Sequence, residues 1–351
     1  MQLPNTIIYN LLIIALTCVL VSTLRNIALK IQLVDAPGGR KQHQGDIPLV
    51  GGIAMFCGFF IALSFLPISL THYYPLLAST ALLVLVGAID DFRELSARFR
   101  LVAQFIAMLI IILLGHITLN QLGNLLAFGT LYLGYFAIPF TLFATLSLIN
   151  AVNMMDGIDG LAGSLTVVSL LFMVIVSLQA QRHEDVQVLL TAISVLIAFL
   201  CFNFPWPWRA HASVFMGDAG SLFLGGLVAW FSISLSQGSE AAVHPVIMLW
   251  FLAVPLFDLA TVFTIRLRQK RSPFDPGREH MHHHLLDQGF SARRTLLLMC
   301  LAAIIMGSIG LLGHYLKIAD SIMLLLFIAI YIYYLHTILQ QRAKTAIPVV
   351  G

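Results

Sequence analysis

The sequence predicts an all-α, polytopic integral membrane protein. Of its 351 residues, 59% are hydrophobic and 10% are charged, whereas soluble domains carry about 25% charged residues. Long apolar runs alternate with short polar loops, and basic residues gather in every second loop. This alternation is typical of a chain that crosses a bilayer repeatedly. The composition therefore excludes an ordinary soluble domain.

Apolar runs of roughly 17–22 residues fit a hydrocarbon core of ~30 Å, and we count eleven of them. The first has no charged side chain, exceeds the apolar core of a signal peptide and follows no basic segment, so we expect a retained transmembrane helix. In order, the spans lie near residues 6–24, 49–66, 75–89, 101–117, 131–149, 160–178, 186–202, 219–236, 244–264, 294–313 and 319–338. Pro255 inside the ninth span predicts a bend, because proline removes a backbone hydrogen bond.

The basic residues orient these spans. All Lys and Arg residues except Arg182 and Lys317 fall in one set of alternate loops. These loops are 25–48, 90–100, 150–159, 203–218, 265–294 and the tail after 338. By the positive-inside rule they lie in the cytoplasm, so we expect the N-terminus outside and the C-terminus inside. No soluble domain or fixed-period repeat interrupts the pattern, and we expect residues 1–351 to form a single membrane-embedded domain.

Carboxylates gather in the same loops, beginning with Asp90 and Asp91 at the end of the third span. Adjacent residues point in different directions on a helix, so one carboxylate could bind a cation or substrate while the other acts as a base. The alternative is a helix-end pair anchored by Arg93 or Arg98. Arg100 follows closely, and a guanidinium suits phosphate.

The segment 150–160 repeats a polar residue at every third position: Asn150, Asn153, Asp156 and Asp159. On a helix, residues three apart face nearly the same way, so we expect these four side chains to line one side of a turn. Amide and carboxylate oxygens are suitable ligands for Mg²⁺. The alternative is a set of helix caps, although a cap needs only one such residue.

Asp218 opens the eighth span within Phe-Met-Gly-Asp-Ala-Gly-Ser. It could cap that helix, which we favour for this motif taken alone, or supply a metal oxygen.

Histidines gather in the loop 265–294, at His280 and residues 282–284, between Arg266 and Arg278. Zinc is one interpretation, and a solvated loop is another. The flanking arginines and the lack of a nearby cysteine favour an anionic phosphate or a sugar instead. Lys41 and His43 in the first cytoplasmic loop could likewise reach a phosphate, or contact lipid headgroups.

One reaction would use all these groups: transfer between a lipid phosphate and a nucleotide-activated donor, with Mg²⁺ neutralising the diphosphate. Such chemistry depends on positioning and charge stabilisation. The rival class is an ion-coupled transporter, which would hold its binding residues near the midplane in two related halves. The candidate acidic groups here fall in the loops that we expect at one face, and no half-to-half similarity is visible.

Five motifs in this order resemble the polyprenyl-phosphate N-acetylhexosamine-1-phosphate transferase family from about residue 30 to 295. They are Asp-Ala-Pro with Arg40, Lys41, His43, Pro48 and the Gly51-Gly52 pair; Asp90-Asp91; Asn150 to Gly160; Phe215 to Ser221; and His280-x-His282-His283. Gly289-Phe290-Ser291 is similar to the branch that uses UDP-GlcNAc, whereas the third histidine, His284, is similar to the branch that uses UDP-MurNAc-pentapeptide. That donor, or another UDP-N-acetylhexosamine, is the alternative.

The resemblance implies that GlcNAc-1-phosphate passes from UDP-GlcNAc to undecaprenyl phosphate, with release of UMP and with Mg²⁺ or Mn²⁺ as cofactor. The site would lie on the cytoplasmic face of the bacterial inner membrane, and the product would begin lipid-linked O-antigen or a related envelope glycan. We expect membrane lipid as a partner and no nucleic acid, and a homodimer is left open.

By the same resemblance, Asn153 and Asp218 bind the metal, and Asp90 or Asp91 is the base that deprotonates the lipid phosphate. Asp156 and Asp159 would shape the nucleotide and diphosphate site. Substrate-binding roles fall to Lys41, His43, Arg100, Asn150, Arg266, Arg278, His280, His282 and His283. We favour a single displacement at the β-phosphorus over a covalent aspartyl intermediate.

Overall fold

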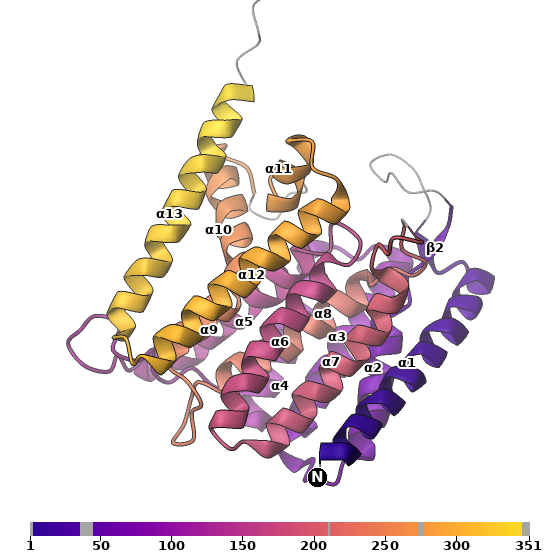
Figure 1. Cartoon of the computed structure of the whole chain (residues 1–351), viewed down its shortest axis with the longest axis horizontal. Coiled ribbons are helices and arrows are strands. Elements are labelled where there is room, and N and C mark those ends of the chain that lie inside the picture. The colour runs from indigo at the N-terminus through magenta and orange to yellow at the C-terminus, as the bar shows by residue number, and fades with distance from the viewer. Residues whose placement is uncertain (1–2, 36–44, 210, 273–276, 346–351) are drawn as a thin grey trace, which may run out of the picture.

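The computed structural model describes residues 3–35, 45–209, 211–272 and 277–345. In this part of the chain the only strands are β1 (Val34–Asp35) and β2 (Ile47–Pro48), which pair antiparallel. The rest is helices packed side by side and the segments that connect them (Figure 1). Lys41 and His43 lie outside the described residues.

The helices follow the predicted spans in order. They are α1 (Leu3–Ile31), α2 (Gly51–Ser64), α3 (Tyr74–Arg93), α4 (Ala97–Gly115), α5 (Ala137–Met154), α6 (Leu161–Gln179), α7 (His183–Asn203), α8 (Gly217–Ser234), α9 (Pro245–Phe251), α10 (Ala253–Arg268), α11 (Met281–Asp287), α12 (Ala292–Tyr315) and α13 (Asp320–Thr345), with short 3₁₀ turns η1 (Thr71–Tyr73) and η2 (Gly134–Phe136). The short helix α11 is the one that the apolar pattern did not predict.

Eight of the described helices are long and apolar enough to cross a membrane, and a ninth span results if α9 and α10 are counted together. The all-α polytopic class is therefore confirmed. Helix α2 is apolar but has only 14 residues, and α8 is buried along nearly its whole length. The count of eleven spans stays a prediction.

The bend predicted in the ninth span is present. Helices α9 and α10 meet at Leu252 with an angle of 84°. Pro255 falls in the first turn of α10, where its missing N–H removes no hydrogen bond from the helix. The break thus lies before the proline, and it brings α10 toward the end of the bundle where α11 lies (Figure 1).

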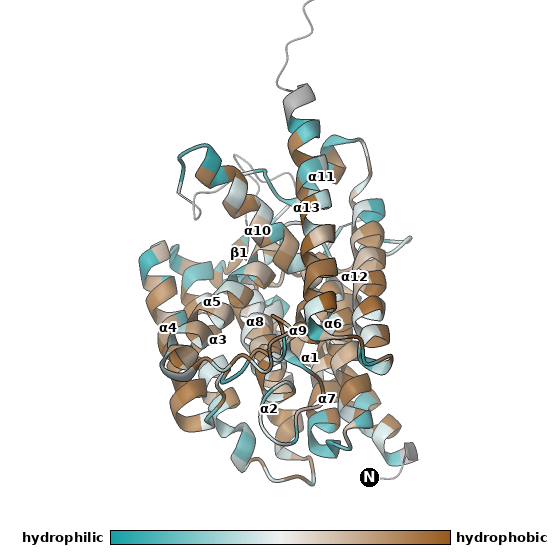
Figure 2. Ribbon diagram, turned by 90° about the vertical axis from the view of Figure 1, so that its left-hand side faces the viewer, coloured by the Kyte–Doolittle hydropathy of each residue, from teal (hydrophilic) through white to brown (hydrophobic). Residues whose placement is uncertain are grey.

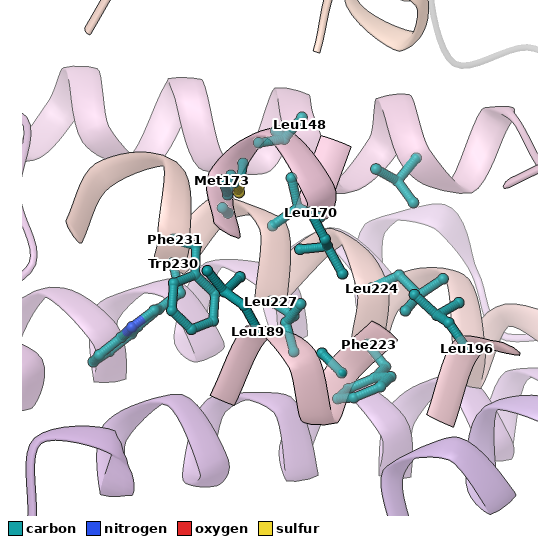
Figure 3. Close-up of a cluster of buried hydrophobic side chains, with 14 of the residues drawn as sticks. Leu148, Leu170, Met173, Leu189, Leu196, Phe223, Leu224, Leu227, Trp230 and Phe231 are labelled. Carbon is teal, nitrogen blue, oxygen red and sulfur yellow. The ribbon is translucent and has the colours of Figure 1, made fainter. Parts of the chain in front are cut away.

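Helix α8 lies at the centre of the apolar core. Figure 3 shows Phe223, Leu224, Leu227, Trp230 and Phe231 of this helix packed among leucines and a methionine of α5, α6 and α7. All five of these α8 side chains are at most 1% exposed. Because α8 is buried on every side, the neighbouring helices pack around it.

Helices α3 and α8 approach each other closely at Gly87. A Cβ at this position would overlap the backbone of Ala219, so only glycine permits the contact. Small residues allow such backbone-to-backbone packing between membrane helices. One turn beyond Gly87 are Asp90 and Asp91, and the contact brings them to the start of α8.

Candidate active site

Side chains from α3, α4, α5 and α8 meet at one end of the bundle. The Asn153 amide donates hydrogen bonds to Asp218 Oδ1 (2.6 Å) and to Ser221 Oγ (2.7 Å). Arg100 Nη1 donates to Asp90 Oδ2 at 3.0 Å and lies 3.4 Å from Asp218 Oδ2. The structure therefore brings together both predicted metal ligands, one candidate base and the predicted phosphate-binding arginine.

The two adjacent aspartates have different partners. Asp91 Oδ1 accepts the Asp218 N–H at 2.7 Å, and its Oδ2 accepts the Ala219 N–H at 3.2 Å. Asp91 thus caps the start of α8, where backbone N–H groups lack partners within the helix. The capping role that the sequence favoured for Asp218 alone is therefore taken by Asp91, and the Asp218 carboxylate is left facing Asn153 and Arg100.

Asp90 faces the cluster itself. Its side chain is buried, its Oδ1 accepts the Leu95 N–H at 2.5 Å, and its Oδ2 pairs with Arg100. Of the two adjacent carboxylates, Asp90 is the one that shares an arginine with Asp218.

A pocket opens beside this cluster between α4, α5 and α8. It encloses about 570 Å³, part of which is open to solvent. Its polar lining consists of Arg100, Gln104, Asn150, Asn153 and Asp218, and its apolar lining includes Leu101, Met154 and Leu222. Asn150 donates to Gln104 Oε1 at 2.8 Å. A ligand with an anionic head and an apolar tail would match the polar and apolar parts of this pocket lining.

The expectation that residues 150–159 share one helical face is wrong. Helix α5 ends at Met154, and the chain then turns to Gly160, whose φ of +79° is readily adopted by glycine. Asp156 and Asp159 lie in this turn, and Asp159 Oδ2 accepts the Ala212 N–H at 2.8 Å. The threefold spacing survives only in Asn150 and Asn153, which have different partners.

The Asp156 carboxylate has a raised pKa. The residue is exposed, yet nearby protein atoms partly desolvate its carboxylate, and this desolvation, followed by the negative charges of Asp218 and Asp159, raises its pKa to about 7. Desolvation and neighbouring negative charge both disfavour the ionised form. A cation or a protonated ligand near the turn would relieve this repulsion.

Helix α11 covers the same turn with histidines. The His282 ring contacts Gly157 so closely that a Cβ there would overlap it. The rings of His280, His282 and His283 lie with centroids 4.2–6.2 Å apart. His282 is buried, neither of its ring nitrogens has a partner among the described residues, and burial followed by the charges of His283 and His280 lowers its pKa to about 3.

Asp258 holds this helix from behind, a contact that the sequence reasoning did not identify. Its Oδ2 lies 2.7 Å from His280 Nδ1, and its Oδ1 accepts the Met281 N–H at 2.5 Å. The available signal was a carboxylate within an apolar span, because such groups are rare and usually functional.

The arginines of this loop have protein partners. Arg266 is 2% exposed, and it pairs with Glu279 at 3.2 Å. Burial alone would raise the pKa of Glu279, but Arg266 and Arg271 hold it below its usual value. Arg278 is exposed and pairs with Asp287. This geometry favours a role for Arg266 in fixing the base of the loop, and substrate binding by either arginine stays a prediction.

The donor set suits a hard divalent cation. No cluster of three or more His, Cys, Asp or Glu side chains that could hold a metal occurs among the described residues. Mg²⁺, however, often takes only one or two carboxylates and completes its shell with water and substrate phosphates. Asp218 can supply one such carboxylate, because it lies next to the Asn153 amide and shares Arg100 with the Asp90 carboxylate.

Known proteins resemble this chain over most of its length. Residues 73–236 match the model of glycosyl transferase family 4. A Yersinia pestis protein named undecaprenyl-phosphate α-N-acetylglucosaminyl 1-phosphate transferase is 38% identical over 88% of this chain and 85% of its own length. Proteins of the same name from Escherichia coli K12 (36% identity, 88% and 84% covered) and Haemophilus influenzae (34%, 90% and 89%) are also similar.

Proposed function

The chain belongs to glycosyl transferase family 4, and we propose that it transfers GlcNAc-1-phosphate from UDP-GlcNAc to undecaprenyl phosphate. The products are undecaprenyl-diphospho-GlcNAc and UMP. Similarity at 34–38% identity to three relatives named for this reaction supports the proposal. The observation that carries it is the pocket whose polar end contains Arg100 and Asp218 and whose remaining wall is apolar.

The acceptor binds in this pocket. Arg100 holds the phosphate, because a guanidinium can form paired hydrogen bonds to two phosphate oxygens. Leu101, Met154 and Leu222 contact the first units of the apolar tail. Asp90 accepts the remaining proton of the phosphate, since its Oδ2 pairs with Arg100, the residue that binds the phosphate. The freed oxygen attacks the β-phosphorus of the donor, and UMP leaves in a single displacement.

The metal is held by Asp218 and Asn153, whose amide can turn its oxygen toward the same space. When bound, Mg²⁺ or Mn²⁺ neutralises charge on the diphosphate. Asp91 keeps the start of α8 in register so that Asp218 faces this space. The turn with Asp156 and Asp159, covered by the histidines of α11, forms the wall for the nucleotide and sugar.

The setting is a bacterial inner membrane with the active site on the cytoplasmic face. The distribution of basic residues supports this orientation, with eleven spans, the N-terminus outside and the C-terminus inside. The hydrophilic segments around α11 and the C-terminal part of α13 lie at the end of the bundle opposite the start of α1 (Figure 2). The whole chain acts as one domain, it can pair as a homodimer, and its product begins lipid-linked O-antigen or a related envelope glycan.

Release of UMP tests the proposal. Detergent-solubilised protein is mixed with undecaprenyl phosphate, Mg²⁺ and either UDP-GlcNAc or UDP-MurNAc-pentapeptide. We expect turnover with UDP-GlcNAc alone, no turnover without metal, and loss of turnover in Asp218→Ala but not in Glu240→Gln, an exposed acidic control. Turnover with the pentapeptide donor alone would assign the chain to the other branch.

A further inference from the structure

Asp258 is a buried carboxylate to which the reaction described above gives no role. It lies in α10, in the span that bends at Leu252, and its side chain is 1% exposed. A carboxylate removed from water is costly unless it is ionically paired and hydrogen-bonded. The partners of Asp258 therefore indicate what it does.

Both oxygens of Asp258 are used on the start of α11. Oδ1 accepts the Met281 N–H, and Oδ2 contacts Nδ1 of His280. One carboxylate thereby fixes both the backbone of the helix and the ring that precedes it. The His280 side chain keeps 12% of its surface exposed, so Nε2 is the ring nitrogen left for a ligand.

Other ionisable groups lie around this pair. Tyr334 of α13 lies within electrostatic range of Asp258, and its hydroxyl has no hydrogen-bond partner among the described residues. His283 and His284 of α11 also interact electrostatically with Asp258. On the ring side, His280 stacks on His282 at 5.5 Å. Among these groups, Asp258 alone is a carboxylate in contact with His280, so it determines where that ring carries its proton.

We propose that Asp258 is a positioning residue that keeps a proton on Nδ1 of His280 and thereby directs Nε2 toward the sugar-diphosphate of the donor. The proposal rests on the proposed function for the identity of that ligand. A histidine ring can present either nitrogen, and the hydrogen bond made by one nitrogen decides the state of the other. Carboxylates behind metal-binding and catalytic histidines act in this way.

Replacement by asparagine separates shape from proton placement. The Met281 N–H is always a donor, so in Asp258→Asn the amide oxygen must accept it, and the amide NH₂ must face His280 Nδ1. Nδ1 can then only accept, and the ring proton moves to Nε2. We expect kcat/KM for UDP-GlcNAc to fall on the order of 10²-fold, with the KM for undecaprenyl phosphate changed by less than about threefold.

Nitrogen NMR of protein labelled on histidine measures the proton placement directly and needs no substrate. The chain has 12 histidines, and the His280 signal is the one lost in His280→Gln. We expect Nδ1 to be protonated in the wild type and Nε2 alone in Asp258→Asn. Tyr334→Phe removes a neighbouring hydroxyl to which the described residues offer no hydrogen-bond partner, so it should leave the spectrum and the kinetics unchanged.

The outcomes distinguish this inference from the proposed function. A wild-type His280 that lacks a proton on Nδ1, or an unchanged tautomer in Asp258→Asn, overturns the positioning role whatever the activity. A changed tautomer with unchanged kcat/KM overturns its relevance to the reaction. If the wild type releases no UMP from UDP-GlcNAc, the proposed function fails while the NMR result still decides the role of Asp258.

Discussion

Substitution of Asp91 by asparagine should misplace the Asp218 carboxylate without removing the base. Asp91 accepts two backbone N–H groups at the start of α8, at 2.7 and 3.2 Å. The amide of asparagine has one oxygen, so its NH₂ group faces one of these donors and leaves it unsatisfied. That costs about 1–3 kcal/mol, which corresponds to a factor of about 5–150 in the equilibrium that holds Asp218 in place.

The assay is the initial rate of UMP release at saturating substrates over a range of Mg²⁺ concentrations. Because the loss acts through Asp218, the proposed metal ligand, Asp91→Asn should raise the half-saturating Mg²⁺ concentration about 10–100-fold, and high Mg²⁺ should restore most of kcat. Asp90→Asn should lower kcat about 10²–10⁴-fold at every Mg²⁺ concentration. Glu94→Gln, at an exposed position just after α3, is the matched control and should behave as the wild type.

Two results would refute the division of roles between the adjacent aspartates. One is a loss of kcat in Asp91→Asn that equals that of Asp90→Asn and that high Mg²⁺ does not restore. The other is a wild-type kcat in Asp90→Asn. The first result would mean that the contacts of Asp91 with α8 are incidental to its function, and the second would mean that Asp90 is not the base.

Three further predictions concern the walls of the site. Gly157→Ala should lower kcat/KM at least about tenfold, because the added Cβ overlaps His282 and must displace it or the turn. An unfolding temperature in detergent close to that of the wild type excludes general damage, and an unchanged kcat/KM would count against the contact. Arg100→Lys keeps the charge but loses the planar fork, so we expect the KM for undecaprenyl phosphate to rise about tenfold while that for UDP-GlcNAc changes little; the reverse pattern would move Arg100 to the donor. Folding lowers the pKa of His282 from 6.5 to about 3, so between these pH values the unfolded chain binds a proton that the folded protein does not. The stability that the neutral ring contributes is therefore present above pH 6.5 and is lost as the pH falls toward 3. The unfolding temperature in detergent should drop less between pH 7 and 4.5 in His282→Asn than in the wild type, and equal drops would contradict the buried neutral ring.

Most of the helices could be predicted from the sequence because long apolar runs mark them. Each predicted apolar run coincides with a helix, or with the pair α9 and α10, to within several residues. Boundaries were less accurate where a helix extends beyond the apolar part. The run 131–149, for example, stops before Asn150 and Asn153, although α5 continues to Met154. Polar residues at the end of a span can remain helical when neighbouring helices satisfy them.

The site was predicted as a set of residues but not as an arrangement. The threefold spacing at 150–159 predicted that the four polar side chains share one helical face. The helix instead ends at Met154, and the chain turns before Gly160, which has a positive φ. The role of Asp258 could not be inferred either, because it depends on α11, whose seven residues are too few to give a clear pattern. Motif resemblance pointed to Asp90, Arg100, Asn153 and Asp218, which the structure brings together, whereas their hydrogen bonds depend on contacts between segments far apart in the sequence.

The adjacent aspartates illustrate why such contacts decide chemical roles. Asp90 and Asp91 are the same residue type at neighbouring positions, and no local property of the sequence separates them. What separates them is the approach of α3 to α8 at Gly87, which turns Asp91 toward the backbone N–H groups of Asp218 and Ala219 and leaves Asp90 with Arg100. A side chain at Gly87 would push α8 away and break the contacts of Asp91 with its backbone, while the partners of Asp90, Leu95 and Arg100, lie outside α8. The assignment of base and cap therefore depends on a residue that carries no functional group of its own.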